Sequence, residues 1–227
     1  MKGIIFDFNG TLYWDSQLHY DAWIEFSKKI RGYSFTKEEM RDKMFGHTNA
    51  DIIEYAIGKK PTNEMVDKYA KEKEALYRKR CLLEPENFKL AKGAIELLDY
   101  LKENNIPRTI ATMSEWDNVD FYIKNFHLEN WFDLDKIVYS DGTIPGKPAP
   151  DIFLIAAENI GLKPQDCIVI EDAIAGINAA KNANIGKIIA IDSIEPIEFY
   201  QNIEGLAGII KDFTEFDKNL LEIPEKV

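Results

Sequence analysis

Short segments that are apolar at nearly every position recur along the chain, and they constrain its fold more than any other feature. A strand with one exposed face alternates apolar and polar residues, whereas a strand in a parallel sheet covered on both faces does not. Five segments have the second pattern and a sixth has it more weakly: residues 3–8, 108–112, 136–139, 166–170, 186–191 and 207–210. We therefore expect a parallel sheet that is buried on both faces.

Apolar residues with helical spacing lie between these segments. Three stripes have this spacing: Ala94, Leu97, Leu98 and Leu101; Phe153, Ala156, Ala157 and Ile160; and Ile174, Ile177 and Ala180. Alternating strands and helices build βαβ units. The sequence thus predicts an α/β fold with a doubly wound parallel sheet.

One long region interrupts this alternation, because residues 15–86 contain no convincing strand. Connections between parallel strands are usually much shorter than this region. Its helical signals are the stripe Leu18, Ala22, Phe26 and Ile30, a capping box of Thr36 and Glu39, and the register Met65, Tyr69, Glu72 and Leu76. We expect a catalytic core formed by residues 1–14 and 87–227, with residues 15–86 inserted as an all-helical cap domain.

Composition and charge exclude several classes of protein. The 227 residues carry a net charge of −11, which argues against a general binder of nucleic acid or of anionic membranes. No apolar segment approaches the roughly 20 residues that span a bilayer, and the apolar run at the N-terminus is too short for a signal peptide. Cys81 and Cys167 are expected to be buried thiols, which fits a reducing, cytoplasmic location. A monomer is compatible with the sequence.

Chemically reactive residues follow the expected strands. In a doubly wound sheet, ligands bind at the carboxyl ends of the strands. The residues found at these ends or in the loops beside them are Asp7, Asn9, Gly10 and Thr11 after the first segment, Thr112, Met113 and Ser114 after the second, Lys147 in GTIPGKPAPDIF, and Glu171 and Asp172 after CIVI. Three acids, one lysine and several hydroxyl groups are thus expected at one edge of the sheet.

This combination predicts phosphate chemistry with a metal ion. Clustered carboxylates repel one another unless a cation lies among them, and ligands that are all oxygen select a hard ion such as Mg²⁺. A lysine and a hydroxyl group beside that ion suit the oxygens of a phosphoryl group. Asp7 can then act as the nucleophile and form an aspartyl phosphate.

Four motifs in the same order resemble those of the haloacid dehalogenase superfamily, in the branch with a helical cap after the first motif. That branch includes β-phosphoglucomutase and phosphoglycolate phosphatase. DFNGTL resembles the first motif, usually DxDGT; Thr112 matches the hydroxyl residue of the second; GKPAPDIF and VIEDAIAGINAAKNA resemble the lysine motif and the acidic motif. The resemblance covers essentially the whole chain, and one motif alone would be weak evidence.

The resemblance implies a role for each matching residue. Asp7 would be the nucleophile and a metal ligand, and Asn9 would offer its backbone carbonyl to the metal. Thr112 and Lys147 would hold the phosphoryl oxygens, with Met113 and Ser114 beside them as substrate contacts. Asp172 would bind Mg²⁺, and Glu171 would bind it directly or through water. Thr11 is expected to brace the turn.

Two histidines in the cap are further candidates for binding the substrate. His19 lies one helical turn before Trp23 and His47 lies in FGHTNADI. Ordinary packing or exposure is the competing interpretation for His19. In the segment FGHTNADI, β-phosphoglucomutases have an arginine that grips a second phosphate, whereas this chain has Asn49. That difference favours hydrolysis over a mutase reaction.

Asn9 is the one departure from the family pattern. In the phosphatase and mutase branches this position is normally an aspartate that donates and later accepts a proton, which an amide does not do at neutral pH. The residue is natural to a divergent phosphatase group, or it is an engineered change that traps an intermediate, or the protein is a binding module that has lost turnover. We predict a Mg²⁺-dependent phosphomonoester hydrolase for a small phosphorylated metabolite, with a sugar phosphate as one candidate. The alternatives are a β-phosphoglucomutase-like phosphotransferase and a phosphate-binding module with low turnover.

Overall fold

The computed structural model describes residues 2–44, 47–193 and 196–221. The chain divides into two compact units, which we call the sheet unit (Met1–Trp14 with Leu90–Val227) and the helical unit (Asp15–Lys89). The sequence predicts borders after residue 14 and after residue 86, whereas the second border between the two compact units lies after residue 89.

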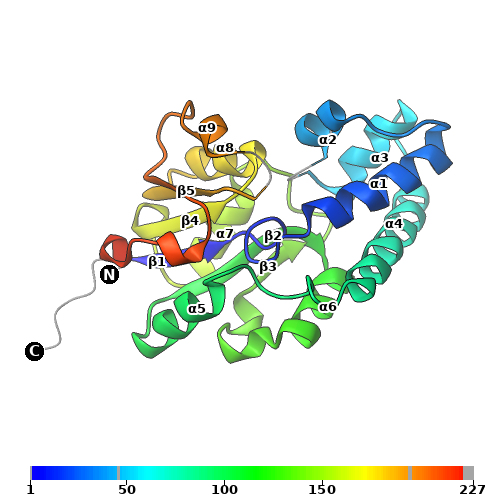
Figure 1. Ribbon diagram of the computed structural model, residues 1–227. Coiled ribbons are helices and arrows are strands. Elements are labelled where there is room, and N and C mark those ends of the chain that lie inside the picture. The colour runs from blue at the N-terminus through cyan, green and yellow to red at the C-terminus, as the bar shows by residue number, and fades with distance from the viewer. Residues whose placement is uncertain (1, 45–46, 194–195, 222–227) are drawn as a thin grey trace, which may run out of the picture. The chain divides into compact units, whose positions relative to one another are not determined.

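The sheet unit contains one six-stranded sheet in which every pair of neighbours is parallel (Figure 1). The strands are β1 (Gly3–Phe6), β2 (Arg108–Glu115), β3 (Val138–Ser140), β4 (Cys167–Glu171), β5 (Lys187–Ile191) and β6 (Gly208–Ile210). Each of the six apolar segments overlaps one strand, and β2, β3 and β4 extend beyond the carboxyl ends of their segments. The predicted doubly wound parallel sheet is therefore confirmed.

The strand order β3-β2-β1-β4-β5-β6 creates a switch point beside β1. The chain first builds outward from β1 through β2 to β3, and then crosses to the other side of β1 to form β4. Phe6 pairs with Ile110 on one side and with Ile170 on the other. The residues that follow these three positions therefore leave the sheet at the same level, where open α/β sheets bind their ligands.

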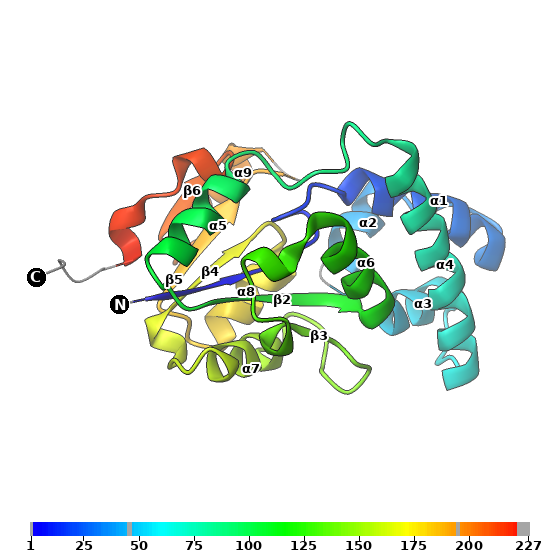
Figure 2. The same cartoon turned by 90° about the horizontal axis from the view of Figure 1, so that it is seen from below.

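Helices cover both faces of this sheet (Figure 2). On one face lie α5 (Ala94–Glu103) and α6 (Trp116–Phe126), and on the other lie α7 (Asp151–Asn159), α8 (Ile174–Asn182) and the short α9 (Ile197–Tyr200). The described residues include five short 3₁₀ helices, three in connections between strands and helices and two after β6: Leu128–Asn130, Leu134–Lys136, Pro164–Asp166, Phe213–Glu215 and Lys218–Leu221.

The three apolar stripes predicted for the helices of the sheet unit face its core, except for Ile174. Leu97, Leu98 and Leu101 are buried in α5, as expected for an amphipathic helix against a sheet. Ile174, however, is 37% exposed, although Ile177 and Ala180 of the same stripe are buried. Ile174 is the first residue of α8, where the helix begins.

The helical unit consists of α1 (Ser16–Arg31), α2 (Lys37–Lys43), α3 (Asn49–Ile57) and α4 (Asn63–Leu83). Its core gathers aromatic and aliphatic side chains from α1, α2, α3 and α4, among them Trp23, Phe26, Met40 and Ile53. The predicted capping box of α2 is present, because Thr36 and Glu39 exchange hydrogen bonds, and Thr48 and Asp51 form a second one at α3.

The buried face of α4 differs from the one that apolar spacing suggests. It consists of Ala70, Lys73, Glu74, Tyr77 and Cys81, whereas Met65, Tyr69, Glu72 and Leu76 are only partly buried. A hydropathy pattern treats Lys and Glu as exposed. Here the two are adjacent and joined by an ion pair of 2.9 Å, which lets both lie inside.

Both cysteines are buried free thiols, as the sequence predicts, and burial raises the pKa of Cys167 to about 12. Across the described parts of the chain, no helix combines the length and the apolar character that crossing a membrane requires.

A first prediction concerns Glu39, which accepts two hydrogen bonds from Arg31 at 2.9 and 3.0 Å. These bonds lower the pKa of Glu39 to about 2. We expect Glu39→Gln to reduce the free energy of unfolding by about 1–2 kcal/mol at pH 7. Folding lowers the pKa of Glu39, so this stabilisation is fully present at pH values above the pKa that Glu39 has in the unfolded chain. It is lost as the pH falls through the pKa that Glu39 has in the folded protein. The difference from the parent protein should therefore shrink from pH 4.5 towards pH 2.

The measurement is urea unfolding followed by circular dichroism at pH 7, 4.5 and 3. Glu38→Gln makes the same charge change at the neighbouring, exposed position and serves as the control. A loss that is equal for the two variants, or that does not depend on pH, would contradict the role given to Glu39.

Candidate active site

Four charged side chains meet where β1 and β4 end. Asp7 follows β1, and its backbone N–H donates to the carbonyl of Ile170 at 3.1 Å. Glu171 is the last residue of β4, Asp172 follows it, and Lys147 comes from the loop before α7. Each of the four residues is at most 6% exposed. Charges that are this buried must be paired.

Lys147 joins two of the acids. Its Nζ donates to Oδ1 of Asp7 at 2.6 Å and to Oε1 of Glu171 at 2.5 Å. Burial by itself lowers the pKa of Lys147, but the charges of Asp7 and Glu171 outweigh it and raise that pKa above its ordinary value. The side chain of Lys147 is therefore a fixed, buried cation inside the cluster.

Ionisation of Asp172 is disfavoured in this arrangement. Burial first, and then the charges of Glu171 and Asp7, raise the pKa of Asp172 well above its ordinary value. Thr11 donates to Oδ1 of Asp172 at 3.1 Å, which gives it a structural contact from the first motif. Three carboxylates surround one ammonium group, so the fully ionised cluster would carry two excess negative charges.

The donor set suits a hard divalent cation. Such an ion would balance the two excess charges, and every available donor is an oxygen. Within residues 2–44, 47–193 and 196–221, no three side chains of His, Cys, Asp or Glu form a ready-made metal site. Asp7 and Glu171 both bind the ammonium group of Lys147 here, so the fit lies in the charge and chemistry of the donors.

Two glycines leave room for these acids. Gly10 has φ of +78°, and a Cβ at this position would lie 2.0 Å from Oδ2 of Asp172. A Cβ at Gly176 would lie 1.7 Å from Oε1 of Glu171. Both distances are far shorter than any van der Waals contact. The glycines of the first and acidic motifs are therefore required by the close approach of the two carboxylates.

The side chain of Asn9, which is neutral, is held by three hydrogen bonds. Oδ1 of Asn9 accepts from Ser114 Oγ at 2.7 Å and from Thr112 Oγ1 at 3.3 Å, and Nδ2 of Asn9 donates to the Tyr122 hydroxyl at 2.7 Å. Thr112 and Ser114 are two residues apart on β2 and therefore lie on one face of the strand. Met113 lies between them, is half-buried and packs against the hydrophobic core.

The last third of the sheet unit supplies two hydrogen bonds that the sequence did not reveal. The hydroxyl of Tyr200, which is fully buried, donates to the carbonyl of Asp172 at 2.6 Å. Ser193 donates to the carbonyl of Gly10. Both donors belong to the segment after β5 and hold the backbone of the two loops that carry Asn9 and Asp172. No motif marks them, because each bond joins residues far apart in the chain.

The two histidines predicted to bind substrate lie in the helical unit. His19 is partly buried and stacks on Tyr77 with ring centroids 3.8 Å apart. Its Nδ1 lies 2.7 Å from Nζ of Lys73, and its Nε2 lies 3.4 Å from Oδ2 of Asp15. His47 is also partly buried, and burial lowers its pKa.

The hydrogen bonds of His19 continue across the helical unit. Lys73 binds Glu74 at 2.9 Å, and Glu74 in turn accepts from Asn49 at 3.0 Å. Asn49 opens α3, so one polar chain joins α1, α4 and α3. The sequence singled out His19 and Asn49 but missed Lys73 and Glu74, which no local pattern distinguishes from exposed charges.

The comparisons with known proteins agree with this geometry. A family model described as a haloacid dehalogenase-like hydrolase matches residues 1–184. The solved structure of a HAD hydrolase, family IA, variant 3, from Entamoeba histolytica is 42% identical, with a TM-score of 0.86 over 98% of this chain and 99% of that one.

Curated relatives carry the names of enzymes that act on phosphorylated compounds. The beta-phosphoglucomutase of Bacillus subtilis is 31% identical, over 82% of this chain and 81% of its own length. The phosphorylated carbohydrates phosphatase of Thermotoga maritima is 25% identical, over 84% of this chain and 85% of its own.

A second prediction tests the bond from Tyr200. Tyr200→Phe preserves the ring and leaves the buried carbonyl of Asp172 without this donor, which typically costs about 1–3 kcal/mol. We expect the midpoint of urea unfolding to fall accordingly. Tyr20→Phe removes the hydroxyl of a partly buried tyrosine in the helical unit and is the control. An unchanged midpoint in Tyr200→Phe would show that the hydroxyl does not support the loop.

Proposed function

Because the chain belongs to the haloacid dehalogenase-like hydrolase family, we propose that it is a Mg²⁺-dependent phosphatase for a small phosphorylated metabolite. The observation that carries this proposal is the buried cluster of Asp7, Lys147, Glu171 and Asp172 at the switch point of the sheet. A carboxylate held beside a fixed cation, with further carboxylates around it, is suited to nucleophilic attack on a phosphoryl group.

Asp7 is the proposed nucleophile. Its carboxylate oxygen attacks phosphorus, the bond from phosphorus to the ester oxygen breaks, and an aspartyl phosphate forms; the alcohol leaves with a proton taken from solvent water, because the amide of Asn9 does not supply one. Water then attacks the phosphorus of this intermediate, which releases inorganic phosphate and restores Asp7. Lys147, bound to Asp7 at 2.6 Å, provides positive charge next to the reacting oxygens throughout.

The metal would be held by oxygen donors at the same edge. Asp7, Asp172 and the backbone carbonyl of Asn9 are the proposed ligands, with Glu171 bound directly or through water. When bound, Mg²⁺ neutralises the excess charge of the carboxylates and stabilises the charge on the transferred phosphoryl group. The hydrogen bonds from Thr11 to Oδ1 of Asp172 and from Tyr200 to its backbone carbonyl support this role for Asp172.

The phosphoryl oxygens are assigned to Lys147 and Thr112. Thr112 is only 2% exposed, lies in the carboxyl half of β2 and donates to Oδ1 of Asn9 at 3.3 Å. Ser114 and Met113 are proposed as neighbouring substrate contacts, and Ser114 has the hydroxyl group that suits this role. His19 and His47 remain predicted substrate-binding residues of the helical unit.

Hydrolysis is favoured over a mutase reaction. Relatives named as phosphatases and a relative named beta-phosphoglucomutase both match most of the chain, so similarity alone supports either activity. Asn49 stands where the mutases are expected to have an arginine, and its amide binds Glu74 at 3.0 Å. A neutral amide gives a second phosphate group far weaker support than a guanidinium.

The direct test is a panel of phosphorylated metabolites assayed with and without Mg²⁺. We expect release of inorganic phosphate from at least one sugar phosphate or related ester. Formation of an isomeric sugar phosphate without free phosphate would favour the mutase. Binding of phosphate without turnover of any ester would favour the binding module.

A third prediction concerns Asp7 and the metal. Asp7→Asn should lower turnover on the order of 10⁴-fold or more, because it removes the nucleophile. It should also weaken Mg²⁺ binding measured by calorimetry, since the same carboxylate is a proposed ligand. Excess chelator should stop the parent enzyme while circular dichroism stays unchanged, because the apolar strands hold the fold.

Asp166→Asn makes the same change at the amino end of β4, where Asp166 pairs with Lys2 at 3.2 Å, and should have no effect on turnover. Near-normal turnover of Asp7→Asn would refute the aspartyl phosphate, and full activity in excess chelator would refute the metal dependence.

A fourth prediction concerns Asn9. The amide cannot supply a proton to the leaving oxygen or accept one from water, so the intermediate should accumulate when the leaving group is good. We expect stopped-flow hydrolysis of p-nitrophenyl phosphate to show a burst followed by a slower steady rate. Asn9→Asp should raise the steady rate on the order of ten-fold or more. Ser114, Thr112 and Tyr122 surround position 9 with hydroxyl groups that can donate to a carboxylate.

Asn125→Asp makes the same substitution on the exposed side of α6 and is the control. If the parent protein shows no burst and Asn9→Asp is no faster, Asn9 does not limit the reaction.

A further inference from the structure

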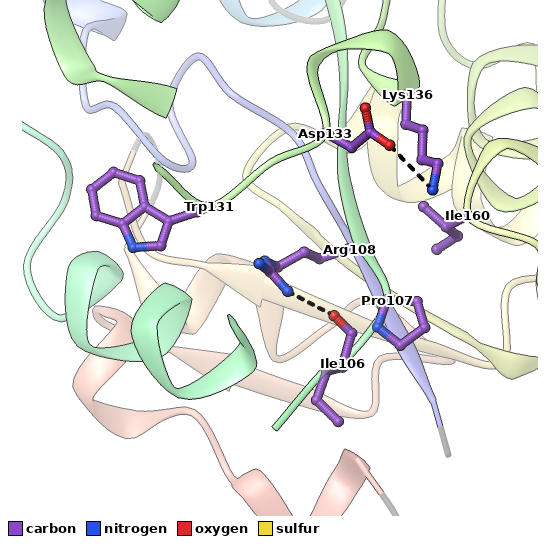
Figure 3. A pocket seen from close by; sticks show the side chains of 7 residues that line it. All are labelled: Ile106, Pro107, Arg108, Trp131, Asp133, Lys136 and Ile160. Atoms are coloured by element: carbon purple, nitrogen blue, oxygen red, sulfur yellow. Dashed lines mark hydrogen bonds and ion pairs between the residues drawn. The ribbon is translucent and has the colours of Figure 1, made fainter. Parts of the chain in front are cut away.

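The sheet unit has a cavity that lies away from the candidate active site. Its volume is ≈ 280 Å³, and it is lined by residues 106–108, Trp131, Asp133, Lys136 and Ile160 (Figure 3). Arg108 is the first residue of β2, and Thr112 and Ser114 follow later on the same strand. The cavity therefore lies at the amino end of β2, whereas the candidate active site lies at the carboxyl ends of the strands.

Arg108 is the residue that makes this cavity unusual. Its Nη1 donates to the carbonyl of Ile106 at 2.9 Å, but its Nε is buried and has no hydrogen-bond partner. No carboxylate among the described residues forms an ion pair with it. Buried polar donors are nearly always satisfied, and a partly buried guanidinium without an anion is costly. Arginine does not relieve that cost by losing its proton.

The acids near this cavity are engaged elsewhere. Asp133 pairs with Lys136 at 3.3 Å, and both side chains are about half exposed (Figure 3). Asp99 accepts a hydrogen bond of 2.6 Å from Nε1 of Trp131. The residues that line the cavity carry two positive charges and one negative charge. This local excess of positive charge contrasts with the net charge of −11 of the whole chain.

We propose that this cavity binds a small oxyanion whose oxygens accept hydrogen bonds from the guanidinium of Arg108. The planar fork of arginine matches carboxylate and phosphate groups, which can accept from two of its N–H groups together. Pro107 and Ile160 provide apolar walls for the rest of the ligand. A volume of ≈ 280 Å³ leaves room for a small anion.

This site is separate from the proposed phosphatase centre and does not depend on it. Its ligand does not have to be the substrate, because no nucleophile or cluster of carboxylates adjoins Arg108. The chemistry of the cavity specifies an oxyanion, and either a carboxylate or a phosphate could provide it.

The experiment is an NMR titration of the ¹⁵N-labelled full chain. Inorganic phosphate, acetate and chloride are added in separate titrations at constant ionic strength. The side-chain Nε–H signal of Arg108 and the backbone amides of Ile106 and Trp131 report on the cavity. We expect saturable shifts with phosphate, acetate or both, with a Kd on the order of millimolar for such small ions. The oxyanion that binds more tightly identifies the ligand class.

Three variants test the assignment. Arg108→Gln should weaken the response of Ile106 and Trp131 at least ten-fold, while shifts around Ser114 caused by phosphate at the other end of β2 persist. Arg108→Lys retains the charge without the fork and should bind at an intermediate level. Arg80→Gln removes an arginine of the helical unit, which pairs with Glu25 at 2.8 Å, and should titrate like the parent.

The proposal is wrong if neither oxyanion gives a saturable shift at the cavity. It is also wrong if chloride produces the same response as the oxyanions, or if both Arg108 variants titrate like the parent. A persistent response at Ser114 would in each case leave the proposed active site unaffected.

Discussion

The ion cluster around Lys147 is the constraint on which the rest of the sheet unit depends. Lys147 binds Asp7 at 2.6 Å and Glu171 at 2.5 Å, and all three side chains are almost completely buried. None of these charges is stable in that position without the others. The parallel pairing of β1 with β4 brings Asp7 and Glu171 together, and the loop before α7 must then deliver Lys147 between them. The glycines at positions 10 and 176 follow from the same crowding.

Asn9 is best understood against this charge distribution. Asp7, Glu171 and Asp172 already exceed the single ammonium group, and this excess raises the pKa of Asp172 together with burial. An aspartate at position 9 would add a fourth acid to the same edge. The amide avoids that repulsion and is held by Ser114, Thr112 and Tyr122, but it cannot move protons. Charge balance and acid–base chemistry therefore favour different residues at this position.

Each unit has a cationic side chain that is withdrawn from water, but the two side chains differ in the partners that compensate their charge. In the helical unit Lys73 is 1% exposed and is compensated by His19 and by Glu74, which Asn49 also binds. In the sheet unit Arg108 has no such compensation for its Nε, and a cavity adjoins it. The contrast is the physical basis for assigning a ligand to the second case and internal polar structure to the first.

The sequence alone determined the secondary structure of the sheet unit and the residues that follow its strands, because both depend on local spacing. Six apolar segments predicted six strands, and the motifs placed Asp7, Lys147 and Glu171 at one edge. Only the tertiary structure decided which distant groups meet. The bond from Tyr200 to Asp172, the burial of Lys73 and the uncompensated Nε of Arg108 depend on how elements pack. Hydropathy treats every lysine and arginine alike, and only packing determines which of them loses its water and finds, or lacks, a partner.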